Sequence, residues 1–388
     1  MLNRSDFRKR SNYFLALGSE MLRPLLRVIA RCVAPGTVLP PQRWRRGLLL
    51  GAAHIGDVLY RTASIEALKT GLPDCAWHYL AERGSLPVLE THPHLAGTIE
   101  GELPRVGSAA FLALARRLRA LRFDVAICYD TGTYWPALML AAAAGIPNRV
   151  GYTHKGFSGL VTHPVAVRGP QSFPAYFRDL VAELTGRKPE WPLRPVVVTT
   201  AADDAEAANL WQELAFDPGV PVLACFVTTR QPSGVWPRAA YAEVVRPLTE
   251  RYRVQVVLCG APADAALLAD LQRDHGLDCQ IAAGRLGLRA LVSFLRRCTA
   301  VLSTDSGPRH LANAAGVPVF FVRNLWFSKV EAGAYCETEI DLAPDAELSS
   351  ASEEGAAFRD LTPESVSSTV AARLVLPLRS DGGPSAVR

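Results

Sequence analysis

Short apolar runs alternate with longer amphipathic stretches from about residue 47 onward. Buried strands are predicted from the apolar runs at residues 47–53, 76–81 and 124–129. Helices are predicted between and after them, at residues 57–68, 109–121 and 134–144. Strands that alternate with helices of this length predict a parallel sheet that is covered by helices on both faces.

The pattern is interrupted at residues 187–195, where three prolines occur in RKPEWPLRP, and it then starts again. Further strands are predicted at residues 220–227, 254–259, 280–283, 300–303 and 317–322. Further helices are predicted at residues 238–251, 263–275, 288–297, 308–315 and 363–374. We therefore expect two doubly wound α/β domains, with ligands beyond the carboxyl ends of the strands.

The expected boundaries follow from this pattern. An N-terminal extension spans residues 1–46, the first domain residues 47–190 and the second domain residues 191–345. Residues 346–388 hold an acidic loop, the last helix and a tail. A chain of 388 residues with 49% hydrophobic and 20% charged residues is long enough for two such domains.

Composition argues against several classes of protein. No uninterrupted apolar run approaches the roughly 20 residues that span a bilayer. The eight cysteines are scattered without a CxxC pair, which indicates free thiols in a reducing cytoplasm. There is no acidic pair or His/Cys cluster with metal-ligand spacing, so we expect neither a metal nor another cofactor.

Charge is concentrated at the N-terminus. The first 46 residues hold ten basic and two acidic side chains and carry +8, which leaves −3 for the rest of a chain whose net charge is +5. This body has no nucleic-acid signature, so we expect no nucleic-acid partner. Within the extension, apolar residues recur at helical spacing between arginines: Phe14, Leu15, Leu17, Met21, Leu22, Leu25, Leu26, Val28 and Ile29. Such a helix fits peripheral contact with an anionic membrane. A helix packed on its own domain, or a loose arm, is the alternative that this pattern leaves open.

The first candidate site is the loop Gly51–Leu59, which follows a strand and opens a helix. It is not a P-loop, because Asp57-Val58 stands where Lys-Ser/Thr is required, nor GxGxxG, because residue 53 is Ala. Two roles are open for Asp57. It can cap the helix, or it can be a carboxylate at the crevice that takes a proton.

The second candidate site is Ser303–His310, STDSGPRH, where a strand runs into a helix start. The free N–H groups and the helix dipole at that start make an anion site. Hydroxyls of Thr304 and Ser306 can donate to the anion, and Arg309 or His310 can add positive charge. Asp305 would repel phosphate and suits sugar hydroxyls. Capping by Asp305 or Ser306 is the alternative.

Two weaker loops follow predicted strands of the second domain. The loop from Thr228 to Pro237 is rich in hydroxyls and contains Arg230, so it can hold phosphate. The loop from Cys259 to Asp264 enters a helix, and Asp264 can cap that helix or reach a nucleotide ribose.

These motifs together resemble those of glycosyltransferase family 9, the heptosyltransferases of lipopolysaccharide core synthesis, which have the two-Rossmann-domain GT-B fold. The resemblance covers roughly residues 47–325, in the family's order. It is carried by Gly56-Asp57-Val58-Leu59, Trp236-Pro237, Gly260 with Asp264, Gly284-Arg285-Leu286 before Leu288-Arg289-Ala290-Leu291, and Thr304 to Ala312.

The resemblance implies a role for each matching residue. Asp57 is similar to the family's general base, with His54 and Gly56 in the loop on the acceptor side. Asp264 matches an acidic position associated with the nucleotide. The donor-binding turn would consist of Thr304, Asp305, Ser306, Gly307 and His310.

Three departures from the family pattern stand out. The family usually has a phosphate-binding Lys shortly before Trp-Pro, where this chain has Gly234-Val235. Arg230, with Thr228 beside it, is our hypothesis for a replacement. The family's Gly-Pro-Thr is replaced by residues 323–327, RNLWF, and the extension before residue 47 is longer than the family's usual start.

The implied enzyme is an inverting, metal-independent glycosyltransferase with two domains that face each other across a cleft. It would move a sugar such as heptose from a nucleotide diphosphate sugar, for example ADP-heptose, to a hydroxyl of a lipopolysaccharide-type or lipid-linked glycan. We expect it in the cytoplasm, on the inner membrane. The alternative is a non-catalytic GT-B-like module that binds sugar nucleotides or glycans. A dinucleotide oxidoreductase is disfavoured, because neither domain has GxGxxG.

Overall fold

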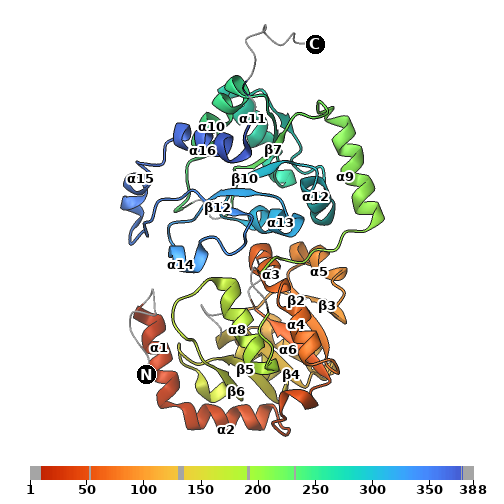
Figure 1. Cartoon of the computed structure of the whole chain (residues 1–388). Coiled ribbons are helices and arrows are strands. Elements are labelled where there is room, and N and C mark those ends of the chain that lie inside the picture. The colour runs from red at the N-terminus through yellow and green to blue at the C-terminus, as the bar shows by residue number, and fades with distance from the viewer. Residues whose placement is uncertain are drawn as a thin grey trace. The chain divides into compact units, whose positions relative to one another are not determined.

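The computed structural model describes residues 10–51, 54–129, 135–189, 193–230, 233–376 and residue 378. The chain divides into two compact units, Met1–Leu193 (unit 1) and Arg194–Arg388 (unit 2). Each unit has one parallel sheet with helices around it (Figure 1).

Unit 1 contains a six-stranded sheet of order β3-β2-β1-β4-β5-β6. All of its neighbouring strands pair in parallel. Its strands are β1 (Arg46–Leu50), β2 (Ala76–Ala81), β3 (Gly97–Glu100), β4 (Val125–Cys128), β5 (Asn148–Tyr152) and β6 (His163–Val165). Its helices are α1 (Arg10–Met21), α2 (Arg23–Val33), α3 (Ile55–Thr62), α4 (Ile65–Gly71), α5 (Pro87–Glu90), α6 (Ala109–Ala120), α7 (Trp135–Ala143) and α8 (Phe173–Thr185).

Unit 2 repeats this arrangement, with the parallel order β12-β11-β10-β7-β8-β9. Its strands are β7 (Val222–Phe226), β8 (Gln255–Leu258), β9 (Gln280–Ile281), β10 (Ala300–Thr304), β11 (Val319–Val322) and β12 (Glu339–Asp341). Its helices are α9 (Ala201–Glu213), α10 (Arg238–Arg251), α11 (Ala265–His275), α12 (Leu288–Leu295), α13 (Gly307–Ala315), α14 (Lys329–Ala332), α15 (Glu354–Ala357) and α16 (Pro363–Leu374). In both units, the order reverses between the first and fourth strands, the place where doubly wound sheets bind ligands.

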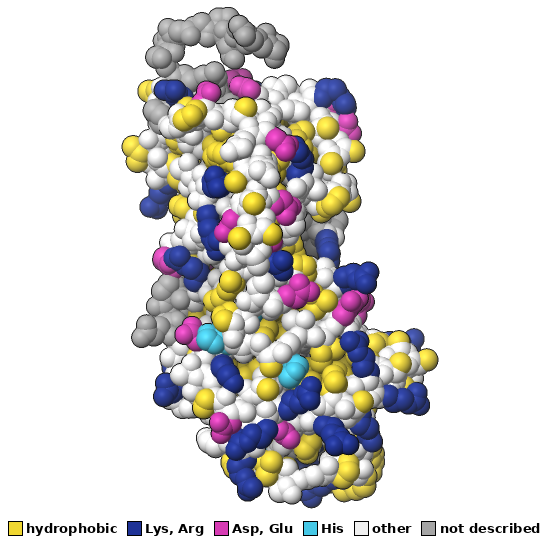
Figure 2. Space-filling model, turned by 90° about the vertical axis from the view of Figure 1, so that its right-hand side faces the viewer, with side chains coloured by type: hydrophobic (Ala, Val, Ile, Leu, Met, Phe, Trp, Pro, Cys, Tyr) yellow, Lys and Arg dark blue, Asp and Glu magenta, His cyan; other side chains and the backbone are white. Residues whose placement is uncertain are grey.

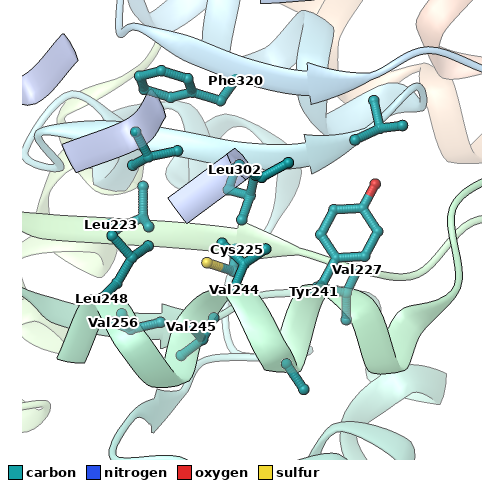
Figure 3. Packing of buried hydrophobic residues seen from close by; sticks show 14 of the residues in the cluster. Leu223, Cys225, Val227, Tyr241, Val244, Val245, Leu248, Val256, Leu302 and Phe320 are labelled. Atoms are coloured by element: carbon teal, nitrogen blue, oxygen red, sulfur yellow. The ribbon is translucent and has the colours of Figure 1, made fainter. Parts of the chain in front are cut away.

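The central strands are buried on both faces because helices cover both sides of each sheet. All five residues of β7 and of β10 are buried. Figure 3 shows Leu223 and Cys225 of β7 close to Leu302 of β10, with Val244 and Leu248 of α10 packed beneath them. This near-continuous apolar character is typical of parallel strands, and it holds the carboxyl ends of β7 and β10 side by side.

Several elements differ from the sequence-based prediction. The single helix expected over residues 57–68 is two helices, because the backbone turns after Thr62 and the N–H of Ser64 bonds to the carbonyl of Arg61. The alternation did not reveal strands β3, β5, β6 and β12 or helices α5, α8, α9 and α14. The acidic loop expected after residue 345 contains the short helix α15. Helices α10 and α16 begin and end at the predicted residues.

The N-terminal extension contains two helices that pack on unit 1. The Ser19 hydroxyl accepts a hydrogen bond from the N–H of Phe157 at 2.8 Å, and the Glu20 carboxylate accepts two from Ser158, at 2.8 and 2.6 Å. The extension is thus a helix pair docked on its own domain, which was one of the alternatives. Within the described residues, no helix combines the length and apolar character needed to cross a membrane.

Candidate active site

Asp57 lies in the first turn of α3, just after β1, and its side chain is half-buried. Its Oδ1 atom accepts a hydrogen bond from the hydroxyl of Tyr60 at 2.7 Å, one turn along the same helix. The N-cap residue is the exposed His54, which forms no side-chain capping bond. The capping role considered for Asp57 is therefore not what the structure shows: its carboxylate is held by a side chain and remains partly open to solvent.

Gly56 is the second residue of α3 and is half-buried. Before the helix, Gly51 lies against the ring of Tyr129, where an added Cβ would come within 2.1 Å of a ring carbon. A side chain at residue 51 would therefore displace Tyr129, so this glycine permits a close approach of backbone and ring. Residues 52 and 53 of the predicted loop lie outside the described residues.

In unit 2, three predicted donor residues are linked by hydrogen bonds at the carboxyl ends of β7, β8 and β10. Thr228 donates its hydroxyl hydrogen to Asp264 Oδ2 at 3.0 Å. Thr304, the last residue of β10, donates to the carbonyl of Thr228 at 3.3 Å. Asp264 Oδ2 also accepts the N–H of Ala261 at 2.8 Å, so it ties the loop that enters α11. The structure thus joins three loops that are far apart in sequence into one polar rim.

Ser306 and Gly307 mark the start of α13. Ser306 is the N-cap residue but makes no side-chain capping bond, and its hydroxyl instead lies 2.9 Å from the Thr304 hydroxyl. Pro308 follows within the first turn, where its missing N–H costs no helical hydrogen bond. The helix start lies beside two hydroxyls, which is the composition expected of an anion site.

Asp305 is held from two sides. Its Oδ1 accepts from Arg309 Nη1 at 2.8 Å, and its Oδ2 accepts the N–H of Asn324 at 3.2 Å. Asp305 therefore does not cap α13, and its orientation is fixed by α13 and by the segment after β11. A carboxylate with lone pairs to spare can still accept from sugar hydroxyls.

The structure corrects the predicted role of Arg309. The sequence analysis suggested that its positive charge could help to bind the anion. It is 1% exposed and its guanidinium is fully engaged: it donates to Glu339 at 2.6 Å, to Asp305, and to the carbonyls of Ala332 and Gly333. Burial acts to raise the pKa of Glu339, but the charge and hydrogen bonds of Arg309 outweigh burial and hold that pKa below its usual value. Arg309 is thus a structural cation beneath the site.

His310 is buried beside Tyr335. Its Nδ1 lies 2.6 Å from the Tyr335 hydroxyl, which also accepts from Asn313 Nδ2 at 3.1 Å. Burial raises the pKa of Tyr335 well above its usual value, so this phenol stays protonated. The ring of His310 therefore lies against Tyr335, which Asn313 of the same helix also contacts.

Arg230 is exposed, and the structure does not join it to the polar rim. Its neighbours 231 and 232 lie outside the described residues. The remainder of this loop is docked on residues 323–327. Gly234 donates to Glu354 and accepts from Leu325, and a Cβ on Gly234 would lie 2.1 Å from the Trp326 ring. The two departures from the family pattern therefore pack against each other.

In the part of the chain that the structure describes, no group of three or more His, Cys, Asp or Glu side chains could hold a metal ion.

Two doubly wound units of the same strand order are the architecture of the GT-B fold. The sequence pattern of glycosyltransferase family 9 (heptosyltransferase) matches residues 111–321. The chain belongs to glycosyltransferase family 9.

Similar proteins agree with this assignment. Lipopolysaccharide heptosyltransferase 2 of Escherichia coli K12 is 24% identical over 296 residues, which cover 70% of this chain and 80% of that protein. The glycosyltransferase family 9 structure from Veillonella parvula superposes with a TM-score of 0.72 at 18% identity, over 88% of this chain and 99% of the other. The structure of E. coli ADP-heptose lipopolysaccharide heptosyltransferase II gives a TM-score of 0.65 at 20% identity. The match covers 85% of this chain and 98% of that one. At these identities, the two structures bear on the fold alone.

Sequence reasoning missed the residues that hold the site. Tyr60 could have been found, because it is three positions after Asp57 on a predicted helix and so shares its face. Arg309 stands four positions after Asp305 and was available by the same argument. Glu339 and Tyr335 belong to a segment without a hydrophobic pattern that predicts a helix or strand. Their contact with α13 could therefore not be predicted from the sequence.

Proposed function

We propose that this protein is an inverting heptosyltransferase that moves heptose from a nucleotide diphosphate sugar, ADP-heptose by analogy with the E. coli relative, to a hydroxyl of a lipopolysaccharide-type glycan. The observation that carries the proposal is that one family 9 chain contains both a candidate base and a candidate diphosphate-binding site. A half-buried carboxylate is oriented in unit 1, and a polar rim lies beside a helix start in unit 2. Relatives that are named lipopolysaccharide heptosyltransferases support this choice of sugar and acceptor.

On the donor side, the diphosphate lies at the start of α13. The N–H groups there and the hydroxyl of Ser306 stabilise the charge that the leaving diphosphate gains, while Arg230 supplies a cation. Thr304 holds the loop of Thr228 beside this helix start. Asp305, held by Arg309, accepts hydrogen bonds from the sugar. Asp264 keeps Thr228 in place and lies next to the nucleotide, and His310 buttresses the helix start from behind.

On the acceptor side, Asp57 removes the proton of the attacking hydroxyl as the new glycosidic bond forms. Attack from the face opposite the leaving group inverts the anomeric carbon. Tyr60 fixes Asp57 Oδ1 and leaves Oδ2 as the basic atom. His54 and Gly56 border this acceptor position.

The test is Asp57→Asn, assayed by ADP release from ADP-heptose with a heptose-deficient lipopolysaccharide as acceptor. We expect turnover at least about 100-fold below wild type with unchanged ADP affinity, because the substitution removes a general base and keeps the shape of the side chain. Turnover close to wild type would refute the role of Asp57. No ADP release by the wild-type protein with any glycan acceptor would refute the proposed activity and favour a binding module.

We also propose that helices α1 and α2 rest on an anionic membrane at the cytoplasmic face. The fully buried residues of these helices are small, namely Ala16, Ser19 and Ala30, while most of the large apolar side chains are exposed. Phe14 is 65% exposed, Met21 77% and Val28 58%. Arg23, Arg27 and Arg31 are exposed among them, and Lys and Arg side chains also gather on the face of unit 1 that Figure 2 presents.

This arrangement reverses the usual one, in which a docked helix buries its large apolar residues. Outward apolar side chains with interleaved arginines suit the boundary between anionic headgroups and acyl chains. The test is co-sedimentation with phosphatidylglycerol vesicles for wild type, for Met21→Glu/Leu25→Glu, and for the control Leu112→Glu. Leu112 is an exposed leucine of α6 in the same unit. We expect only the double variant to lose binding. Equal binding of the double variant and wild type would refute the contact.

A further inference from the structure

Helices α1 and α2 lie along unit 1 (Figure 1), and both pack on the turn Ser158–Leu160 in the loop between β5 and β6. The Ser19 hydroxyl accepts the N–H of Phe157 at 2.8 Å. Both carboxylate oxygens of Glu20 accept from Ser158, one from its N–H and the other from its hydroxyl. The helix pair therefore binds a loop that lies 138 positions further along the chain.

The fit between the helix pair and the β5–β6 loop leaves no room for side chains at two glycines. A Cβ on Gly156 would lie 2.8 Å from Ser19 Oγ, and a Cβ on Gly159 would lie 2.6 Å from the carbonyl oxygen of Arg23. Gly156 also has a φ of +89°, which residues with a side chain rarely adopt. The loop is thus shaped for a partner that lies directly against its backbone, and α1 and α2 are that partner.

Phe157 has a backbone conformation that its own side chain disfavours. Its φ is +57° and its ψ is +23°, in the left-handed region that bulky residues seldom occupy. Such strain persists only where the surrounding structure imposes it. Here Ser19 holds the N–H of Phe157, whose ring stacks on Trp135 at a centroid distance of 5.1 Å. Loss of the bonds from Ser19 or Glu20 should therefore allow the loop to relax.

The β5–β6 loop belongs to the edge of the sheet at which Asp57 lies. Strands β1, β4 and β5 are parallel neighbours in this order. Neighbouring strands are about 4.8 Å apart, so the loop begins about 10 Å from the end of β1, the strand that precedes Asp57. Residues 153–155 are half-buried, whereas residues 156–160 are buried. The loop therefore borders the position at which the acceptor hydroxyl is proposed to meet Asp57.

We propose that α1 and α2 are a positioning element for the acceptor side of the site. Ser19 and Glu20 hold the β5–β6 loop in the shape that receives the glycan next to Asp57. This inference rests on the proposed function, because Asp57 locates the acceptor at this edge of unit 1. It gives the N-terminal extension, one of the three departures from the family pattern, a role in acceptor affinity that is separate from the proposed membrane contact.

The experiment measures steady-state ADP release by the full chain in detergent solution, where membrane contact does not contribute. Heptose-deficient lipopolysaccharide and ADP-heptose are varied in separate series. We expect Ser19→Ala and Glu20→Ala each to raise KM for the acceptor about 3- to 10-fold, the effect of losing one or two hydrogen bonds. KM for ADP-heptose and kcat should stay close to wild type, because only acceptor binding depends on this loop. Glu20→Gln keeps an oxygen for the N–H of Ser158 and should lie between wild type and Glu20→Ala.

Ser108→Ala is the matched control. The Ser108 hydroxyl accepts the N–H of Phe111 at 3.1 Å at the start of α6, so this variant loses the same kind of bond in the same unit. It should lower thermal stability and leave both KM values unchanged. Hydrogen exchange of the Phe157 and Ser158 amides should become faster in Ser19→Ala and Glu20→Ala, and stay unchanged in Ser108→Ala. This measurement tests the hold on the loop without an activity assay.

An acceptor KM close to wild type in both Ser19→Ala and Glu20→Ala, or an equal rise of that KM in Ser108→Ala, would overturn the positioning role. Wild-type turnover would in either case leave the proposed transferase activity standing. Absence of ADP release by the wild-type protein would instead refute the proposed function, and this inference with it.

Discussion

The hydroxyl of Tyr60 donates to Oδ1 of Asp57 across 2.7 Å, one turn along α3. This bond occupies one carboxylate oxygen, Oδ1, and so restrains the orientation of the whole carboxylate group. The Tyr60 ring itself lies 5.0 Å from the Arg61 guanidinium and stacks with the ring of Phe173. The base is thus oriented by a side chain that is itself packed in place.

Tyr60→Phe should lower kcat about 3- to 10-fold, the effect of losing one hydrogen bond, and leave ADP affinity unchanged. The measurement is ADP release at saturating acceptor. The control is Tyr60→Phe in the Asp57→Asn background, where it should cost nothing further if Tyr60 acts only through Asp57. Additive losses would show that Tyr60 works by another route.

Gly234 combines a left-handed backbone with a close approach. Its φ is +74°, and a Cβ would lie 2.1 Å from Trp326. Gly234→Ala should therefore destabilise unit 2 by about 1–3 kcal/mol and weaken ADP binding, since the loop that carries Arg230 must shift. Denaturant unfolding and calorimetry with ADP measure the two effects.

Gly219→Ala is the matched control for this prediction. Gly219 has φ +76° in the same unit, but nothing lies within 4 Å of its missing Cβ. It should show backbone strain alone, with a smaller loss of stability and normal ADP binding. Equal effects of the two substitutions would mean that contact with Trp326 is unimportant.

The sequence allowed prediction of the sheets where strands are apolar on both faces and helices have clear periodicity. That is why the boundaries of β2, α10 and α16 agree with the prediction. Strand β5 was not predicted because it begins with Asn148 and Arg149. These residues are polar, yet they are buried and form hydrogen bonds to other segments. Such bonds depend on tertiary partners that no local pattern shows.

The residues of the candidate site also fall into a group that the sequence predicted and a group that it did not. Motif residues such as Thr304 and Asp264 could be placed at strand ends from sequence, because parallel strands share a carboxyl edge. Their partners could not. The sequence suggested a free cation at Arg309, whereas the fold places Glu339 beside it, thirty residues further along the chain. Charge alone does not reveal whether a side chain faces the ligand or the core.

Arg230 offers a direct test of the donor site. Arg230→Ala should weaken ADP binding about 10-fold, because a hydrogen-bonded charge on the diphosphate is lost. Calorimetry measures the affinity. Arg253→Ala serves as control, since Arg253 is an exposed arginine just before β8, at the opposite end of the strands. Unchanged affinity in Arg230→Ala would remove this residue from the phosphate site and leave the hydroxyls and the start of α13 to hold the diphosphate.

The buried pair of Arg309 and Glu339 predicts a pH-dependent stability. The pKa of Glu339 in the folded chain is below its unfolded value, because Arg309 and hydrogen bonds from Tyr335 and Asn313 overcome the effect of burial. The unfolded state therefore binds more protons, and stability rises with pH through this window. The contribution is complete above the unfolded pKa of about 4.3 and is lost as pH falls through the lower, folded pKa.

Glu339→Gln should accordingly reduce unfolding free energy at pH 7 by about 3–5 kcal/mol, since it leaves the guanidinium of Arg309 buried with a weaker acceptor. The difference from wild type should narrow below about pH 4.3. Glu337→Gln is the control, because Glu337 pairs with Arg194 where both side chains are nearly half exposed, and exposed pairs contribute roughly 0–1 kcal/mol. Denaturant unfolding at several pH values measures both variants. If the loss in Glu339→Gln were no larger than in Glu337→Gln, Arg309 would not depend on Glu339, and Asp305 with the carbonyls of Ala332 and Gly333 would suffice to hold it.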